Sequence, residues 1–206
     1  MKVLLINGSP HEKGCTYTAL SLIAGELKAQ GIETEILHVG GQPVGGCIGC
    51  GGCRSGNGCV FGGVVNEAIE KAKTADAFVF GSPVHYASAA GNMASFMDRL
   101  AYAGGKYLAY KPAAICCSAR RAGTTSTLDQ LAKYPQFFQM PLVNGSYWAM
   151  VHGSNPEQVL QDAEGCAVMQ ELGRNMAWLL RCIEAGKAAG IDHPQNPPRP
   201  MTSFIR

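Results

Sequence analysis

The sequence predicts an α/β protein in which helices cover both faces of a doubly wound, five-stranded parallel sheet. Short apolar segments alternate along the chain with amphipathic segments of helical periodicity, which is the pattern of such sheets. Most of the apolar segments are apolar throughout, so these strands are expected to be buried on both faces. With 206 residues, of which 47% are hydrophobic, the chain is long enough to bury one large core.

The strands are expected where short apolar segments are bounded by turn residues. The first ends at Asn7-Gly8-Ser9-Pro10, a run that favours a turn. The second is weaker, because Glu33 and Glu35 interrupt it. The five expected strands are residues 3–6, 32–39, 77–80, 113–117 and a short one at 142–143.

The helices are expected between these strands and after the last one. Gly31 is a stop signal for the first helix. Asn155-Pro156, with Gln158 at the capping-box position, predicts the start of the last helix, and a break in it is expected near Gly165. The expected helices are residues 20–27, 65–72, 93–100, 125–133 and 156–183.

Charge and composition exclude several classes of protein. A formal net charge of +2 provides no strongly basic surface, which argues against binding to nucleic acid. No apolar segment is long enough for a secretory signal or a membrane span, and nine cysteines, an odd number, favour a cytoplasmic protein with reduced thiols. We expect one domain over residues 1–190 and an extended, proline-rich tail over 191–206 that lies over a neighbouring subunit.

Three loops follow apolar strands, at residues 7–16, 81–91 and 118–125, and sheets of this class bind ligands at that edge. The first loop leads into a helix and carries the hydroxyls of Ser9 and Thr16, which favours a phosphate group. It has neither a Lys-Ser/Thr pair nor the three-glycine dinucleotide pattern, so a monophosphate fits best. The alternative is an ordinary strand-to-helix turn.

The second and third loops carry groups that suit a planar, partly anionic ligand. Pro83 stiffens the second loop, and His85 and Tyr86 offer flat rings for stacking. In the third, Arg120 and Arg121 are able to stabilise negative charge. The alternatives are aromatic side chains that simply pack and a charged turn in solvent.

Cys47, Cys50, Cys53 and Cys59 form a C-x2-C-x2-C-x5-C pattern within residues 40–63, a cysteine loop that also holds 11 of the 26 glycines. Zinc sites usually place a dozen or more residues between two cysteine pairs, whereas the compact run is typical of proteins that bind iron–sulfur clusters. Only Arg54 is charged in the loop, so backbone amides are expected to offset a cluster's negative charge. Zinc and a metal-free loop remain alternatives. The other cysteines of the strands and of the last helix, Cys116, Cys117, Cys166 and Cys182, are expected to be core residues.

Together with Phe96-Met97-Asp98-Arg99, the three loops resemble those of the NADPH-dependent FMN reductases, which have a flavodoxin-like fold, over roughly residues 1–185. The resemblance implies bound FMN. It places the phosphate on Ser9, Cys15 and Thr16, the ring against Pro83, Val84, His85, Tyr86 and Ser88, and its pyrimidine end near Ser118, Arg120, Arg121 and Gly123. Two positions depart from the family pattern: Cys15 stands where Asn is frequent, and His85 where an aromatic residue is common.

Within that family the cysteine pattern is similar to that of the iron–sulfur flavoproteins, which implies a [4Fe–4S] cluster on Cys47, Cys50, Cys53 and Cys59. The expected function is an FMN-dependent oxidoreductase with NAD(P)H or reduced ferredoxin as donor, an acceptor the sequence does not identify, and a homodimeric or homotetrameric assembly. No catalytic acid or base is needed, because the flavin carries the chemistry. The alternatives are a flavodoxin-like electron carrier or redox sensor, which the positive net charge disfavours, and a zinc-stabilised interaction module.

Overall fold

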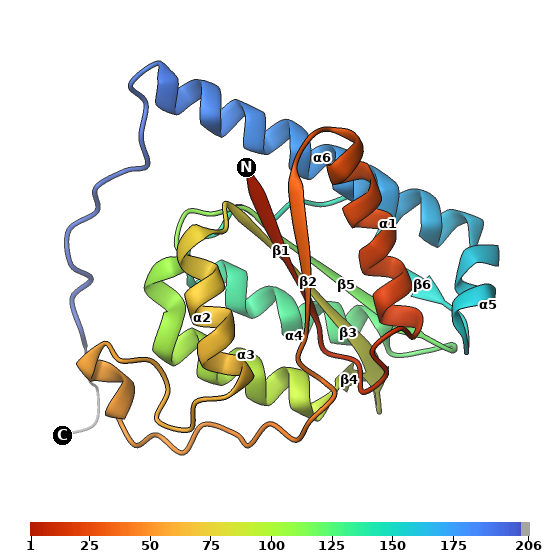
Figure 1. The fold of residues 1–206 in the computed structure, drawn as a ribbon, viewed down its shortest axis with the longest axis horizontal. Coiled ribbons are helices and arrows are strands. Elements are labelled where there is room, and N and C mark those ends of the chain that lie inside the picture. The colour runs from red at the N-terminus through yellow and green to blue at the C-terminus, as the bar shows by residue number, and fades with distance from the viewer. Residues whose placement is uncertain (203–206) are drawn as a thin grey trace.

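The computed structural model describes residues 1–202; positions 203–206, the end of the expected tail, lie outside the described residues. Its sheet has the strand order β2-β1-β3-β5-β6, and these five strands pair in parallel. The strands are β1 (Lys2–Asn7), β2 (Glu33–His38), β3 (Ala77–His85), β5 (Ala113–Ala119) and β6 (Met150–His152). This is the flavodoxin-like order, so the expected fold class is confirmed (Figure 1).

Helices lie on both faces of the sheet, with α1, α5 and α6 on one side and α2, α3 and α4 on the other (Figure 1). The helices are α1 (Cys15–Ala29), α2 (Val64–Thr74), α3 (Gly91–Gly104), α4 (Thr124–Phe137), α5 (Pro156–Gln161) and α6 (Ala163–Ala188), with the short 3-10 helices η1 (Gly52–Ser55) and η2 (Gly105–Tyr107). Within residues 1–202, no helix combines the length and apolar character that a membrane crossing requires.

The alternation of side chains along β1 explains the two layers. Val3 and Leu5 are fully buried among the residues of α1 and α6, whereas Leu4 and Ile6 are buried among those of α2 and α3. Successive strand residues point to opposite faces, so a strand apolar throughout requires cover on both. Each such side chain contributes about 1.5–3 kcal/mol through its burial.

Two helix boundaries follow their sequence signals. Gly31 adopts φ +76 just after α1 and donates its N–H to the Lys28 carbonyl, so the expected stop is confirmed. The Asn155 side chain accepts the Gln158 N–H at the start of α5, as expected.

The break expected near Gly165 lies three residues earlier, at Asp162. The Asp162 carboxylate accepts the Gly165 N–H at 3.0 Å and the His152 N–H at 2.7 Å. A carboxylate that caps the first turn of α6 therefore ends α5 and begins the next helix.

The fifth strand is β6, and the expected strand at 142–143 was wrong. Leu142 forms an isolated parallel bridge with Ala113 at the start of β5. The chain then leaves the sheet and returns at Met150, which pairs with Cys117. From Leu142 to Met150 the chain advances eight positions while β5 advances four, so the intervening segment bulges out of the sheet edge.

The described part of the tail has no helix or strand and runs down one side of the molecule (Figure 1). The His193 ring stacks on Tyr110 with centroids 4.5 Å apart, and Asn196 donates to the Tyr110 hydroxyl at 2.7 Å. These residues therefore lie against their own chain. The expected contact of the tail with a neighbouring subunit stays a prediction.

The cysteines of the strands and helices differ in burial. Cys116 and Cys117 on β5 are fully buried, as expected. Cys166 is half-buried, and Cys182 is exposed, so the expectation that Cys182 is a core residue was wrong. Its position on α6 faces solvent and not the sheet.

Candidate functional site

The three expected ligand loops meet at the carboxyl edge of the sheet. The Thr16 hydroxyl lies 2.8 Å from that of Ser118, which joins the first loop to the third. Gly8 donates its N–H to the carbonyl of Gly81 at the start of the second loop. The three segments therefore lie together at the strand ends, the edge at which such sheets bind ligands.

The first loop is held from within by Asn7, which is fully buried. Its Oδ1 accepts the Ser9 N–H at 3.1 Å, and its Nδ2 donates to the Glu12 carbonyl at 2.9 Å. Ser9 is also buried, and its Oγ accepts the His11 N–H. The loop leads directly into α1, whose first turn presents backbone N–H groups without helical acceptors. An anionic group suits this position.

The side chain of Cys15, at the start of α1, bonds to a segment after β6 and not to the hydroxyls of Ser9 and Thr16. Its Sγ donates to the carbonyl of Gly153, after β6, at 3.5 Å. Burial raises the pKa of the Cys15 thiol, which therefore stays protonated at neutral pH.

The second loop, expected at 81–91, contains a β-hairpin. β3 continues to His85, turns at Tyr86 and Ala87, and pairs antiparallel with β4 (Ser88–Ala89). Both turn residues have positive φ, +49 and +60, as a tight two-residue hairpin requires. Ser82 closes the base of the hairpin by accepting the Ala90 N–H.

The hairpin presents its expected ligand residues to solvent. Pro83 and Val84 are half-buried, and His85, Tyr86 and Ser88 are exposed. Its tip is supported by α4, since Ser126 donates to the Ala87 carbonyl at 2.7 Å. The arrangement provides an accessible apolar and aromatic surface next to the first loop.

The third loop places two cations at the same edge. Ser118 is buried, while Arg120 and Arg121 are exposed. Among residues 1–202, neither arginine takes part in an ion pair. Gly123 has φ +92 and lies so close to the hairpin that a Cβ there would stand 2.7 Å from the Ala87 Cα. The two loops are therefore packed directly on each other.

The cysteine loop leaves β2 and returns at α2 (Figure 1), and helix side chains hold it in place. Asn92 of α3 donates to the carbonyls of Gly40 and Gln42 and accepts the Val44 N–H. Asn66 of α2 bonds to both the N–H and the carbonyl of Cys59. The long loop thus has a defined path without regular secondary structure besides η1.

All four loop cysteines line one cavity of about 450 Å³. Cys47 and Cys50 are exposed, and Cys53 and Cys59 are half-buried. Apolar side chains, including those of Phe61 and Tyr102, line the same space. The four cysteines, which are closely spaced in the sequence, therefore also lie around one cavity in the structure.

The four cysteines share a cavity, but they do not converge on a single metal ion. Within residues 1–202, no three His, Cys, Asp or Glu side chains are arranged to hold one metal ion. A cluster spreads its thiolates over several irons and needs a wider space between the sulfurs than one zinc ion does.

One residue of this cavity was missed by the sequence-based expectation. Arg99 of α3 is only 6% exposed, lines the cavity and donates from Nε to Cys59 Sγ at 3.2 Å. We expected backbone amides to offset the negative charge of a cluster, because Arg54 is the only charged residue of the loop. That expectation was incomplete, since Arg99 brings a second positive charge to this cavity. The sequence did contain a signal for this role: Arg99 follows Phe96 by three residues and therefore lies on the apolar face of the helix.

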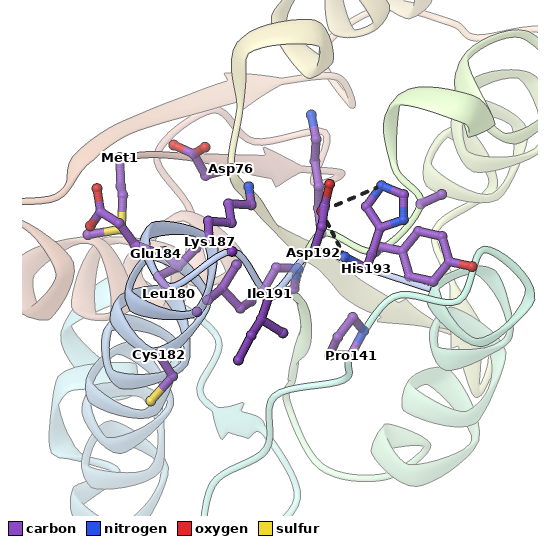
Figure 2. A pocket seen from close by; sticks show the side chains of 17 residues that line it. Met1, Asp76, Pro141, Leu180, Cys182, Glu184, Lys187, Ile191, Asp192 and His193 are labelled. Atoms are coloured by element: carbon purple, nitrogen blue, oxygen red, sulfur yellow. Dashed lines mark hydrogen bonds and ion pairs between the residues drawn. The ribbon is translucent and has the colours of Figure 1, made fainter. Parts of the chain in front are cut away.

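A larger groove of about 1160 Å³ lies at the opposite, amino-terminal edge of the sheet (Figure 2). It is lined by Met1, Asp76 and residues near the end of α6 such as Lys187. The Asp76 carboxylate already accepts the Lys2 N–H, and none of the expected site residues lies here. Because ligands of such sheets bind at the carboxyl ends of strands, the candidate site is the opposite edge.

Comparison with known proteins gives concordant matches. Residues 1–155 match the family described as NADPH-dependent FMN reductase. An iron–sulfur flavoprotein of Methanocaldococcus jannaschii is 27% identical over 192 residues, covering 89% of this chain and 100% of that protein. An iron–sulfur flavoprotein of Archaeoglobus fulgidus is 36% identical over 99 residues, which is 48% of each chain. The solved structure of RosB with a bound riboflavin-phosphate intermediate has a TM-score of 0.70 at 14% identity, covers 100% of this chain and 94% of that one, and is similar in fold.

Proposed function

Since the chain belongs to the NADPH-dependent FMN reductase family and is an FMN-dependent oxidoreductase, we propose that it moves electrons from NAD(P)H or a reduced carrier such as ferredoxin to an acceptor. FMN, when bound, supplies the hydride and single-electron chemistry. The protein binds and orients the flavin at the carboxyl edge of the sheet. It also holds a [4Fe–4S] cluster in the cysteine cavity, through which electrons pass from the flavin to the acceptor.

The first loop is proposed to bind the FMN phosphate. The hydroxyls of Ser9 and Thr16 and the N–H groups at the start of α1, including that of Cys15, are the donors. The buried Asn7 supports this role, because it orders the loop before any ligand binds. Preorganised donors lower the entropic cost of binding.

The hairpin and the third loop are proposed to hold the flavin ring. Pro83, Val84, His85, Tyr86 and Ser88 provide the surface for the ring. Ser118, Arg120, Arg121 and Gly123 lie toward its pyrimidine end, where the two cations favour negative charge on the reduced ring. The unpaired, exposed arginines also suit an approaching phosphorylated donor.

The observation that carries the cluster proposal is the single cavity shared by Cys47, Cys50, Cys53 and Cys59. The names of the relatives from M. jannaschii and A. fulgidus support the same assignment. The loop contains no carboxylate, so the thiols are its only strong metal ligands. We place the protein in a reducing compartment such as the cytoplasm, and we propose that it assembles as a homodimer or a homotetramer.

The test is purification without oxygen, followed by visible spectroscopy and measurement of iron and acid-labile sulfide per FMN. We expect flavin bands, broad cluster absorbance, and loss of the cluster alone in Cys50→Ser. Cys182→Ser, which removes an exposed thiol on α6, serves as the matched control. A colourless, zinc-containing protein contradicts both cofactor assignments, and a yellow protein that takes up no iron contradicts the cluster.

Oxidation of NADH and NADPH by the yellow protein, with quinone, ferric and flavin acceptors, separates an enzyme from a carrier. Consumption of either nucleotide supports the reductase. If neither is consumed with any acceptor while reduced ferredoxin still reduces the flavin, the nicotinamide part of the proposal is wrong.

A further inference from the structure

Arg99 occupies an unusual place for an arginine, since it is almost fully buried within α3. Its guanidinium donates to Cys59 Sγ at 3.2 Å, to the Gly62 carbonyl at 3.1 Å and to the Gly45 carbonyl at 3.4 Å. The Phe61 ring centroid lies 5.3 Å from the guanidinium carbon. One side chain thus joins the beginning and the end of the cysteine loop.

The Arg99 guanidinium is not paired with a carboxylate in the part of the chain that the structure describes. Among residues 1–202, no carboxylate forms an ion pair with Arg99, and the neighbouring Asp98 accepts a hydrogen bond from Tyr134 at 2.6 Å. The described lining of the cysteine cavity includes two arginines, Arg54 and Arg99, and no carboxylate. A buried cation without a counter-ion costs several kcal/mol, so a binding partner that brings negative charge into this cavity is favoured.

We infer that Arg99 is the counter-cation of an anionic iron–sulfur cluster in this cavity and acts on it through the Cys59 sulfur. The inference rests on the cluster of the proposed function. Four cysteine thiolates give such a cluster a net negative charge, and reduction adds a further electron. A positive charge and a hydrogen bond at a ligand sulfur stabilise the reduced form more than the oxidised one, which raises the reduction potential.

Arg99 has a positioning and charge-compensating role and not a catalytic one. Its two bonds to the Gly45 and Gly62 carbonyls hold the ends of the loop. The bond to the Cys59 sulfur places the positive charge at a ligand atom. A purely structural role predicts an effect on loop stability alone, whereas charge compensation predicts a change in cluster potential.

The test compares Arg99→Met, Arg99→Gln and Arg99→Lys with the control Arg54→Met, whose side chain lines the same cavity but is exposed. Each protein is reconstituted without oxygen with iron and sulfide, and the cluster potential is measured by titration followed by electron paramagnetic resonance. At the wild-type midpoint, we expect the reduced-to-oxidised ratio to fall about tenfold in the Met and Gln variants, which corresponds to about 59 mV for one electron. Arg99→Lys keeps the positive charge, so its ratio is expected to lie close to that of the wild type. Arg54→Met is expected to change the ratio less than about twofold.

The outcomes separate the two levels of the proposal. If the wild-type protein binds no iron, the cluster assignment itself fails, and this inference with it. If the wild type binds the cluster, but the reduced-to-oxidised ratio of the Arg99→Met and Arg99→Gln variants stays within about twofold of the wild-type ratio, only the role of Arg99 is overturned. If Arg99→Met fails to fold, as judged by circular dichroism and FMN content, Arg99→Gln decides by the same criterion.

Discussion

The side chain of Asn66 bonds to both backbone polar groups of Cys59. Its Oδ1 accepts the Cys59 N–H at 2.8 Å, and its Nδ2 donates to the Cys59 carbonyl at 3.0 Å. A residue of α2 therefore sets the position of the last cysteine of the loop. The neighbouring Gly58 is required here, since a Cβ on it would lie 2.9 Å from the Asn66 Oδ1.

Asn66→Ala is expected to release Cys59 from this position. Two hydrogen bonds are lost, each worth about 1 kcal/mol, so alkylation of Cys59 in iron-free protein is expected to accelerate about tenfold or more. Mass spectrometry of the alkylated peptides measures the rate. Asn57→Ala, at an exposed position of the same loop, is the control and is expected to leave the rate unchanged. Equal rates in both variants contradict the role of Asn66.

Thr16→Val tests the phosphate site. The substitution keeps the shape of the buried side chain but removes the hydroxyl that lies beside Ser118. Loss of one hydrogen bond to an anion is expected to weaken FMN binding about tenfold or more, measured by quenching of flavin fluorescence. Ser21→Ala, at a half-buried position of the same helix, is expected to bind FMN normally. Unchanged affinity in Thr16→Val means that the phosphate binds elsewhere.

Gly123→Ala tests the packing of the third loop on the hairpin. The added Cβ meets Ala87 at 2.7 Å and Val84 at 2.9 Å, in a backbone with φ +92. Gly31→Ala introduces similar backbone strain at φ +76 with nothing within 4 Å, so it is the matched control. We expect Gly123→Ala to lose about 1–3 kcal/mol more unfolding free energy than the control, and to lose FMN affinity as well. Equal effects show that strain alone is responsible.

Glu35→Gln tests an ion-pair network at the outer edge of the sheet. The carboxylate contacts Lys71 at 2.6 Å and Lys2 at 2.9 Å, and these two ammonium groups, Lys71 first, lower the pKa of Glu35. Because the folded pKa lies below the unfolded value, the stabilisation is present above pH 4.5 and is lost as the pH falls through the folded pKa. The side chain is 30% exposed, so the loss in the variant is expected to be about 1 kcal/mol or less at pH 7.

Urea unfolding at about pH 7 and about pH 3 measures this difference. The wild type and Glu35→Gln are expected to differ at the higher pH and to converge at the lower one. Glu70→Gln, which removes an exposed pair with Lys73, is expected to change stability less at neutral pH. A gap between wild type and Glu35→Gln that widens toward acid pH contradicts the assigned direction.

The cysteines are expected to divide into two classes of reactivity toward iodoacetamide near neutral pH. Burial raises the pKa of Cys117 to about 12 and also raises that of Cys116, so neither forms the reactive thiolate in the folded protein. Cys47 and Cys50 are exposed and are expected to react first. Iron and sulfide reconstitution is expected to protect the loop cysteines while Cys182 stays reactive. Labelling of Cys116 at the rate of Cys47 indicates that the β5 core opens.

The strand β2 was found within the expected residues although two glutamates interrupt it, and the three central strands have a continuous apolar character. β1, β3 and β5 are central and buried on both faces, so their sequences carry the signal. β6 has only three residues at the sheet edge, and its position depends on which part of β5 it pairs with. The hairpin at His85–Ser88 was missed because its turn residues, Tyr86 and Ala87, are not the Asn or Gly that usually mark such turns.

The chain sequence by itself determined the fold class, the three loops at the carboxyl edge and the grouping of four cysteines, because hydrophobic period and residue spacing are local properties. Only the tertiary structure decided that Arg99, forty positions from Cys59, donates to its sulfur. The same holds for the approach of Gly123 to the hairpin and for Asn66 as the support of the cysteine loop. These contacts depend on how helices pack against a loop that has no periodicity of its own, and no local pattern records that packing.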